Sequence, residues 1–380
     1  AWSMRETPLE YELLVENILD LSHVPFSHHG VAGQRPDALP ITMSQVGELS
    51  CERGLAMVTS AADAAMIKRG FASGMLYFTP PNRVHYEITN KNGTHQYLTA
   101  FTTPVAPGKS RYFSRIYTDN EKALPGFAFK LLRSMPPWMV HLSSHQVVDA
   151  DMVLAAGQQR LLSERMAAAE ASSSSGDGNG GTSSAAAPSA QRMDRQFYMP
   201  ATADRAVVAF YKWLNTFSGG RVHYANPGLT QAATAAAGGA HTVAFGAASG
   251  GVERSHILDR YTQHTRHCRL CQEGMVVVQR VAVGALLAAA ASAAGALAVL
   301  ARTNAFAMAA SLATGSPAPV ASSLGGGNMG LAVALGLLAA LCLAVSSAAR
   351  GVKPKFYSGD YTFHDRHIKV PMKSDQGNKK

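Results

Sequence analysis

Four polar side chains near the start of the chain have the spacing of a metal site. The stretch "ENILDLSHVPFSHH" (16–29) contains Asn17, Asp20, His23 and His28 in the pattern Asn-x-x-Asp-x-x-His-x-x-x-x-His. Two neutral imidazoles and one carboxylate on one face of an iron(II) ion leave the opposite face open for dioxygen and substrate. The carboxylate can come from a distant part of the sequence. Asp20 is too close on the same helix to be the natural third ligand, so we expect it to hydrogen-bond His23 or to face an electron donor.

The segment that carries this pattern has the features of a helix with a defined end. Apolar residues from Pro8 to Ser22 recur at helical spacing. Pro25 ends or kinks that helix, which places His23 near its end and His28 just beyond it.

The following segments predict a mixed α and β domain. From about residue 41 to 118, short β-type runs separated by Gly, Pro and Asn indicate an antiparallel sheet. A helical segment is expected at 125–166, broken at Pro136-Pro137, and another at 204–217. Aromatic residues in these segments are expected in the sheet core and the wall of a pocket: Tyr77, Phe78, Tyr97, Phe101, Phe113 and Trp138.

Composition and two long apolar runs suggest how the chain is organised. We predict a domain at 1–228, with a disordered low-complexity insertion at 167–191, and then a flexible segment at 229–280. Two transmembrane helices are predicted at 281–301 and 329–349, because each run holds 21 uncharged residues. A basic tail follows at 350–380. Both outer flanks of this hairpin are basic, so the first domain and the tail are expected on the same, cytoplasm-like side of the membrane.

The overall charge and the four cysteines exclude two classes of protein. The net charge of +9 is scattered, without a basic cluster and interleaved aromatic residues, so nucleic acid is not expected as a partner. Four cysteines do not make a disulfide framework. The sequence begins at Ala1 without an initiator Met, and we expect it to be a piece of a longer protein.

Several stretches together resemble one family, the Rieske-type non-haem iron oxygenases, and within it the chloroplast branch that contains pheophorbide a oxygenase. The matching stretches are "YELLVENILDLSHVPFSHHG", "PVAPGKSR" (104–111), "HQVVDADMVLAAGQQRLL" (145–162) and "ADRAVVAFYKWLN" (203–215). A Cys-x-x-Cys followed by two membrane spans is also the arrangement of that branch.

The resemblance implies roles for particular residues. It assigns a mononuclear iron(II) to His23, His28 and Asp151, with Asp149 as the rival carboxylate. Asp20 would link that iron to a Rieske cluster, across a subunit boundary in a homotrimer. Asn17 would lie near the iron without a defined role.

The resemblance also implies a Rieske [2Fe–2S] cluster that this chain does not ligate. Such a cluster needs Cys-x-His and Cys-x-x-His, and neither occurs in the sequence. We therefore expect the cluster upstream of Ala1. The pair Cys268 and Cys271 has three interpretations: a dithiol switch, a zinc half-site with His264 or His267, or two idle thiols. The resemblance favours a redox-responsive pair that thioredoxin reduces.

The fold implied by the resemblance is α+β: a helix-grip (START-like) domain with an antiparallel sheet, followed by the transmembrane hairpin. The implied function is a monooxygenase that oxidises a chlorophyll-type tetrapyrrole with dioxygen and electrons from ferredoxin. It would lie in the inner envelope or thylakoid membrane of the chloroplast with its catalytic domain in the stroma. The alternatives are a redox-sensing component of the inner-envelope protein-import machinery and a tetrapyrrole-binding module that has lost catalysis.

Overall fold

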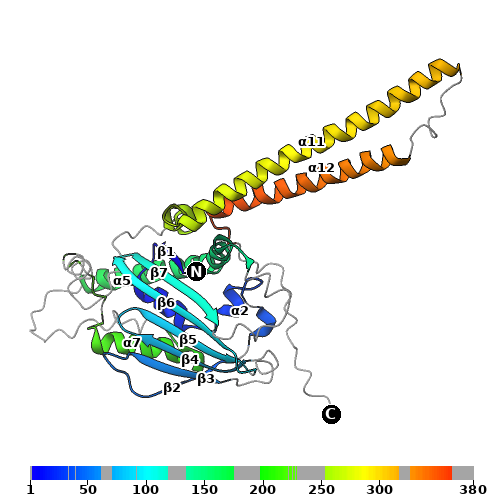
Figure 1. Ribbon diagram of the computed structural model, residues 1–380. Coiled ribbons are helices and arrows are strands. Elements are labelled where there is room, and N and C mark those ends of the chain that lie inside the picture. The colour runs from blue at the N-terminus through cyan, green and yellow to red at the C-terminus, as the bar shows by residue number, and fades with distance from the viewer. Residues whose placement is uncertain are drawn as a thin grey trace, which may run out of the picture. The chain divides into compact units, whose positions relative to one another are not determined.

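In the computed structural model, an antiparallel sheet of seven strands is the frame on which the candidate site is built (Figure 1). The strands are β1 (Ser3–Thr7), β2 (Thr42–Gln45), β3 (Leu55–Ser60), β4 (Phe71–Thr79), β5 (Arg83–Asn90), β6 (His95–Ala106) and β7 (Lys109–Thr118). Strands β2 to β7 pair in sequence order, and β1 joins the sheet beside β7. The predicted α+β class with an antiparallel sheet is therefore confirmed.

The structure describes the following residues: 2–32, 34–38, 40–60, 71–90, 92–118, 134–174, 197–220, 222–224, 226, 228, 253–315 and 326–361. They fall into two compact units, of which the first runs to His264 and includes the segment from Gly359, and the second is Thr265–Ser358.

One helix near each end of the first unit closes the core against the sheet. Helix α1 (Tyr11–Leu19) and helix α7 (Arg205–Phe217) share a buried apolar cluster with strands β3, β4 and β5. Phe210 of α7 illustrates this packing, because its ring lies 5.0 Å from the ring of Phe78 in an edge-on contact. The prediction of Phe78 in the sheet core is confirmed, since its side chain is fully buried.

A second apolar cluster holds the long helix α5 (Pro137–Ser174) beside α1. Leu14 of α1 packs with Val148 and Met152 of α5 in this cluster. Polar contacts reinforce it, because Gln158 donates a hydrogen bond of 2.7 Å to Glu16. Helix α5, which carries Asp151, is thus fixed relative to helix α1, which precedes His23 in the chain.

The second unit is a pair of long apolar helices, α11 (Arg269–Thr314) and α12 (Gly326–Val352). Small residues lie buried between them, including Ala282, Ala289 and Ala339, and the hydroxyl of Ser346 donates a 2.7 Å hydrogen bond to the carbonyl of Ala282. Close packing on small residues is typical of helices in lipid. Both helices are long and apolar enough to cross a membrane, with a mean hydropathy of 2.1 in α11 and 2.4 in α12 over a stretch of 18 residues.

Two segments differ from the sequence prediction. Residues 167–174, which were expected in a disordered insertion, continue helix α5. The rest of that insertion, 175–191, lies outside the described residues. Most of the helix expected before Pro136 also lies outside them. Part of the segment expected to be flexible forms short helices α9 (Arg254–Ile257) and α10 (Arg260–Gln263) and the start of α11. Buried side chains such as Arg260 hold these short helices in place.

An ion pair between the neighbouring strands β1 and β7 makes the unfolding free energy depend on pH. Glu6 accepts a 2.5 Å hydrogen bond from Arg111 and lies 3.0 Å from Lys109. Hydrogen bonds from Arg111 and Lys109 lower the pKa of Glu6 to about 2. Because the folded-state pKa is depressed, this stabilisation is present above the unfolded pKa of about 4.3 and is lost as the pH falls towards the folded value. We expect Glu6→Gln to reduce the fall in unfolding free energy between about pH 5 and pH 2.

The measurement is chemical unfolding of the full chain in detergent across that pH range. The matched control is Glu48→Gln, which alters an exposed carboxylate. An unchanged pH profile in Glu6→Gln would show that the pair contributes nothing to stability.

Candidate metal centre

The two histidines of the N-terminal pattern lie at the two ends of a one-turn helix, α2 (Val24–Ser27). Helix α1 ends at Asp20, whose carboxylate accepts a 2.7 Å hydrogen bond from the backbone N–H of Ser22 and so forms a local turn. His23 then caps the start of α2 and His28 caps its end, with the His28 N–H bonded to the carbonyl of Val24 at 3.1 Å. This short helix brings the two imidazole rings to a centroid separation of 5.1 Å.

Asp151 of helix α5 completes a group of three donor atoms. Its Oδ1 atom lies 3.4 Å from His23 Nε2 and 3.0 Å from His28 Nε2. The two Nε2 atoms are 3.2 Å apart. Three donors that face one point at such separations can occupy one face of a single ion, and two imidazoles with one carboxylate are the ligand type that suits iron(II). The donor set and its geometry therefore fit the expected metal.

The electrostatics of this group suit a cation. Burial opposes the ionised form of Asp151, but hydrogen bonds and charge from His23 and His28 lower its pKa. Burial likewise opposes charge on His23, but the hydrogen bond and charge of Asp151, with the charge of Asp20, raise its pKa. The carboxylate thus remains ionised in a largely buried position, which a positive ion would stabilise.

The other polar residues near His23 and His28 lie outside the group of three donors. Asp20 lies beside His23, with Oδ2 at 3.7 Å from Nδ1, which is too long for a hydrogen bond. Asn17 lines the adjacent cavity. His29 accepts a 3.1 Å hydrogen bond from the N–H of Arg35 and does not belong to the group. Whether Asp20 and Asn17 act in catalysis stays a prediction.

Asp149, the rival carboxylate, is engaged elsewhere. It is buried between two arginines, pairing with Arg5 and accepting hydrogen bonds of 2.9 and 2.7 Å from Arg260. Arg5 also donates to Gln263 at 2.8 Å. Since Asp149 and Asp151 are two residues apart on one helix, their side chains point in different directions, and Asp151 alone reaches the histidines.

A cavity of about 380 Å³ opens beside the three donors. Its wall is mainly apolar, with His23, His28 and Asp151 at one side and Asn17 and Asp20 close by. Three tyrosines from the sheet also line it: Tyr86, Tyr97 and Tyr112. Burial and the charge of Asp151 raise the pKa of Tyr112 to about 12, against an opposing hydrogen bond with Ser114, so its hydroxyl is neutral.

The sequence reasoning did not identify three groups of residues around this centre. The charged group Arg5, Asp149 and Arg260 has no local signal, because its members are far apart in sequence. No sequence pattern singles out Tyr112 either. The third group is a pair of buried histidines on α5, His141 and His145, whose separation by four residues is the signal that could have found them.

The predicted redox pair lies at the start of the second unit. Cys268 is the N-cap of α11 and Cys271 is in its first turn, and neither forms a disulfide with another described residue. Their function stays a prediction.

Comparison with known proteins shows which proteins this chain is similar to. The sequence model of pheophorbide a oxygenase matches residues 78–168, a span that includes Asp151. The chloroplastic pheophorbide a oxygenase of Oryza sativa subsp. japonica is 26% identical over 292 residues, which cover 74% of this chain and 48% of that protein. The resemblance to the pheophorbide a oxygenase-like branch is confirmed.

Other relatives of the pheophorbide a oxygenase-like branch carry different names. Flavonoid 8-hydroxylase 2 of Ocimum basilicum, also chloroplastic, is 24% identical over 284 residues, which cover 70% of this chain and 44% of that protein. The chloroplastic protochlorophyllide-dependent translocon component 52 of Arabidopsis thaliana is 22% identical over 310 residues, which cover 71% of this chain and 46% of that protein. The chain spans about half the length of the curated relatives it matches.

Proposed function

We propose that this chain is the iron-binding and membrane-anchoring part of a monooxygenase that oxidises a chlorophyll-type tetrapyrrole. The observation that carries the proposal is the meeting of His23, His28 and Asp151 at the side of a largely apolar cavity. Iron(II) held in this way supplies the activation of dioxygen when it is bound.

The residues of the chain have distinct parts in this proposal. His23, His28 and Asp151 hold the metal at one end of the cavity, and the apolar wall excludes water from the reacting region. The carboxylate of Asp20, 3.7 Å from His23 Nδ1, marks where electrons enter. Asn17 faces the same cavity and contacts the bound substrate.

The electrons come from a Rieske [2Fe–2S] cluster, which ferredoxin reduces. The present sequence has no Cys-x-His or Cys-x-x-His for such a cluster, and the relatives are about twice as long as the span they share with this chain. In a homotrimer, the cluster of one subunit would deliver electrons near Asp20 of the next.

The cavity and the relatives support the proposed substrate class. Tyr86, Tyr97 and Tyr112 line the cavity, and aromatic side chains suit a flat conjugated ring. Relatives are named for pheophorbide a and for protochlorophyllide, both tetrapyrroles. Flavonoid 8-hydroxylase 2 makes a flavonoid the competing substrate class.

The anchor places the enzyme on a chloroplast membrane. Helices α11 and α12 cross the inner envelope or the thylakoid as a hairpin, and the basic residues at both outer ends keep the catalytic domain on the stromal side. The curated relatives reported above are named as chloroplastic. Thioredoxin is a partner only if Cys268 and Cys271 form a disulfide.

Oxygen transfer by the full-length protein tests this proposal. Protein reduced through ferredoxin and supplied with ¹⁸O₂ is expected to transfer labelled oxygen to pheophorbide a or protochlorophyllide, and mass spectrometry of the pigments measures it. His23→Ala is expected to lose iron and product together, because the remaining two donors no longer make a facial site.

His29→Ala is the matched control, since His29 neighbours a ligand but bonds to backbone. It is expected to keep both iron and product. Normal iron content and turnover in His23→Ala would overturn the proposed site. Labelling of a flavone in place of the tetrapyrroles would overturn the proposed substrate class.

A second function, in the protein-import machinery, is favoured by the similarity to translocon component 52. In that function the anchor and the thiols matter more than turnover. Full-length protein that contains no mononuclear iron and co-purifies with import components would support it. Near-stoichiometric iron with turnover would favour the oxygenase.

A further inference from the structure

A second cluster of buried nitrogen donors, contributed by α5 and by the C-cap of α10, lies away from the candidate iron centre. The rings of His141 and His145, one turn apart, lie 5.2 and 4.2 Å from the ring of His264. All three side chains are at most 2% exposed. Ten residues of helix separate His141 from Asp151, which is about 15 Å along the axis. The cluster is therefore distinct from the group of His23, His28 and Asp151.

Neutral imidazole is the form of histidine that ligates a metal, because one of its ring nitrogens has a free electron pair.

His264 is held in the orientation of a metal ligand. Its Nδ1 lies at hydrogen-bond distance from the backbone carbonyl of Met4. A carbonyl can only accept, so Nδ1 carries the proton and Nε2 carries the lone pair. Histidine ligands in metal sites show this arrangement, in which one nitrogen donates to a carbonyl and the other binds the ion.

Two cysteines follow His264 within seven residues in the sequence. Cys268 follows His264 by four residues and Cys271 by seven, and a fully extended chain covers at most about 3.6 Å per residue. A short turn shortens this path, since the N–H of Cys268 bonds to the carbonyl of Thr265 at 3.2 Å. Continuity of the chain therefore limits the two thiols to at most about 14 and 25 Å from His264.

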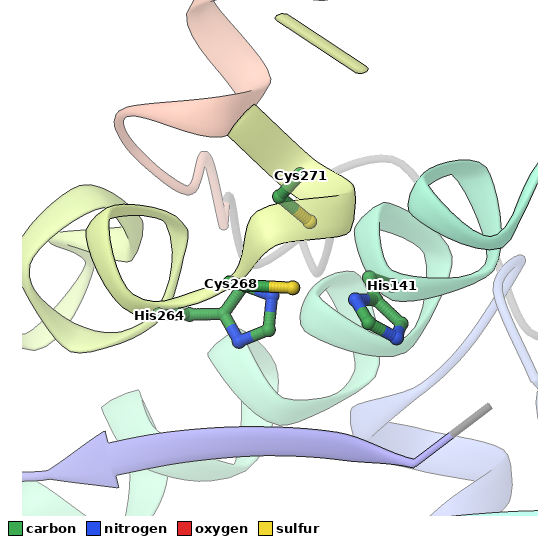
Figure 2. Close-up of side chains that lie close together, drawn as sticks. All are labelled: His141, His264, Cys268 and Cys271. Carbon is green, nitrogen blue, oxygen red and sulfur yellow. The ribbon is translucent and has the colours of Figure 1, made fainter. Parts of the chain in front are cut away.

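Four candidate ligands of two types, two histidines and two cysteines, converge at this point. Figure 2 shows the sulfur atoms of Cys268 and Cys271 turned toward the space beside the ring of His141, with His264 next to them. One donor atom from each of these four residues lies within 4.8 Å of every other. Tetrahedral zinc with bonds of about 2.0–2.3 Å needs donors about 3.3–3.8 Å apart, so small side-chain rotations suffice.

We propose that His141, His264, Cys268 and Cys271 bind a structural zinc ion. Two nitrogen and two sulfur donors are typical of tetrahedral zinc, and four protein ligands close the site to substrate. On binding, each thiol gives up its proton to solvent and both sulfurs coordinate as thiolates, so no oxidant or reductant is required. The site makes the Cys-x-x-Cys pair a metal ligand and competes with disulfide formation.

Metal analysis of the purified full chain tests this proposal. Wild-type protein, purified under reducing conditions without a metal-affinity tag, is expected to contain one zinc ion per chain in addition to iron. The double variant Cys268→Ser/Cys271→Ser is expected to lose the zinc and keep the iron. His267→Ala is the matched control, because His267 is an exposed histidine of the same segment, and it is expected to keep the zinc.

A second measurement avoids dependence on the folding of the variants. Wild-type protein refilled with cobalt(II) is expected to show a thiolate-to-cobalt charge-transfer band in the near ultraviolet. Absence of that band, or wild-type protein without zinc, would overturn the proposal. Zinc retained by the double serine variant would overturn it as well. Loss of iron in His23→Ala with the zinc retained would support two independent sites, whatever the outcome for turnover.

Discussion

Asp151→Asn is expected to remove iron from the chain while leaving it folded. The amide keeps the size of the side chain but lacks the negative charge that lies 3.0 Å from His28 Nε2 and 3.4 Å from His23 Nε2. Replacing a partner outside the ligand set of a metal typically costs about 10–100-fold in metal affinity, so loss of a ligand should exceed that range. Iron content per chain after dialysis, with the thermal midpoint of unfolding, is the measurement.

The control for this experiment comes from the same helix. Asp149→Asn removes the same charge two residues earlier, and any folded fraction of that variant is expected to keep its iron. The iron content of Asp20→Asn should lie between those of the other two variants, because Asp20 lies near His23 but is not one of the three proposed ligands. Wild-type iron content in Asp151→Asn would show that another group supplies the carboxylate.

The different positions of these two aspartates mark a limit of sequence reasoning. The pattern Asn-x-x-Asp-x-x-His-x-x-x-x-His predicts His23 and His28 from local spacing, and the structure brings them together through a one-turn helix. The third donor lies more than 120 residues later. Family resemblance alone favoured Asp151 over Asp149, and only the tertiary partners separate them: two histidines for Asp151, two arginines for Asp149.

The fold shows the same division between local and distant signals. The antiparallel strands and helices α1 and α7 were predicted, because apolar periodicity and turn residues are local properties of the sequence. Strand β1 was not predicted, since its inward-facing positions are Ser3, Arg5 and Thr7, which carry no apolar alternation. Those polar residues are satisfied by groups far away in sequence, such as Ser110 for Thr7.

Asp149→Asn is expected to cause the largest loss of stability of any single substitution considered. Arg5 and Arg260 are both almost fully buried, and Asp149 is the carboxylate that pairs with both. Removing one partner of a buried ion pair costs about 3–5 kcal/mol, because it leaves an uncompensated buried charge. For a domain of this size, that corresponds to a fall in the thermal midpoint on the order of 10 °C.

A second variant, Gly359→Ala, tests the packing around Asp149 without removing a charge. Gly359 packs directly on this carboxylate, so a Cβ atom there would lie 1.9 Å from Asp149 Oδ2. Gly359→Ala should therefore destabilise the chain by displacing Asp149 while all charges remain. Thermal unfolding of both variants beside Asp151→Asn is the measurement. If Asp149→Asn unfolds at the wild-type temperature, the buried arginines must find compensation from other groups, and the assignment of Asp149 as their structural partner is wrong.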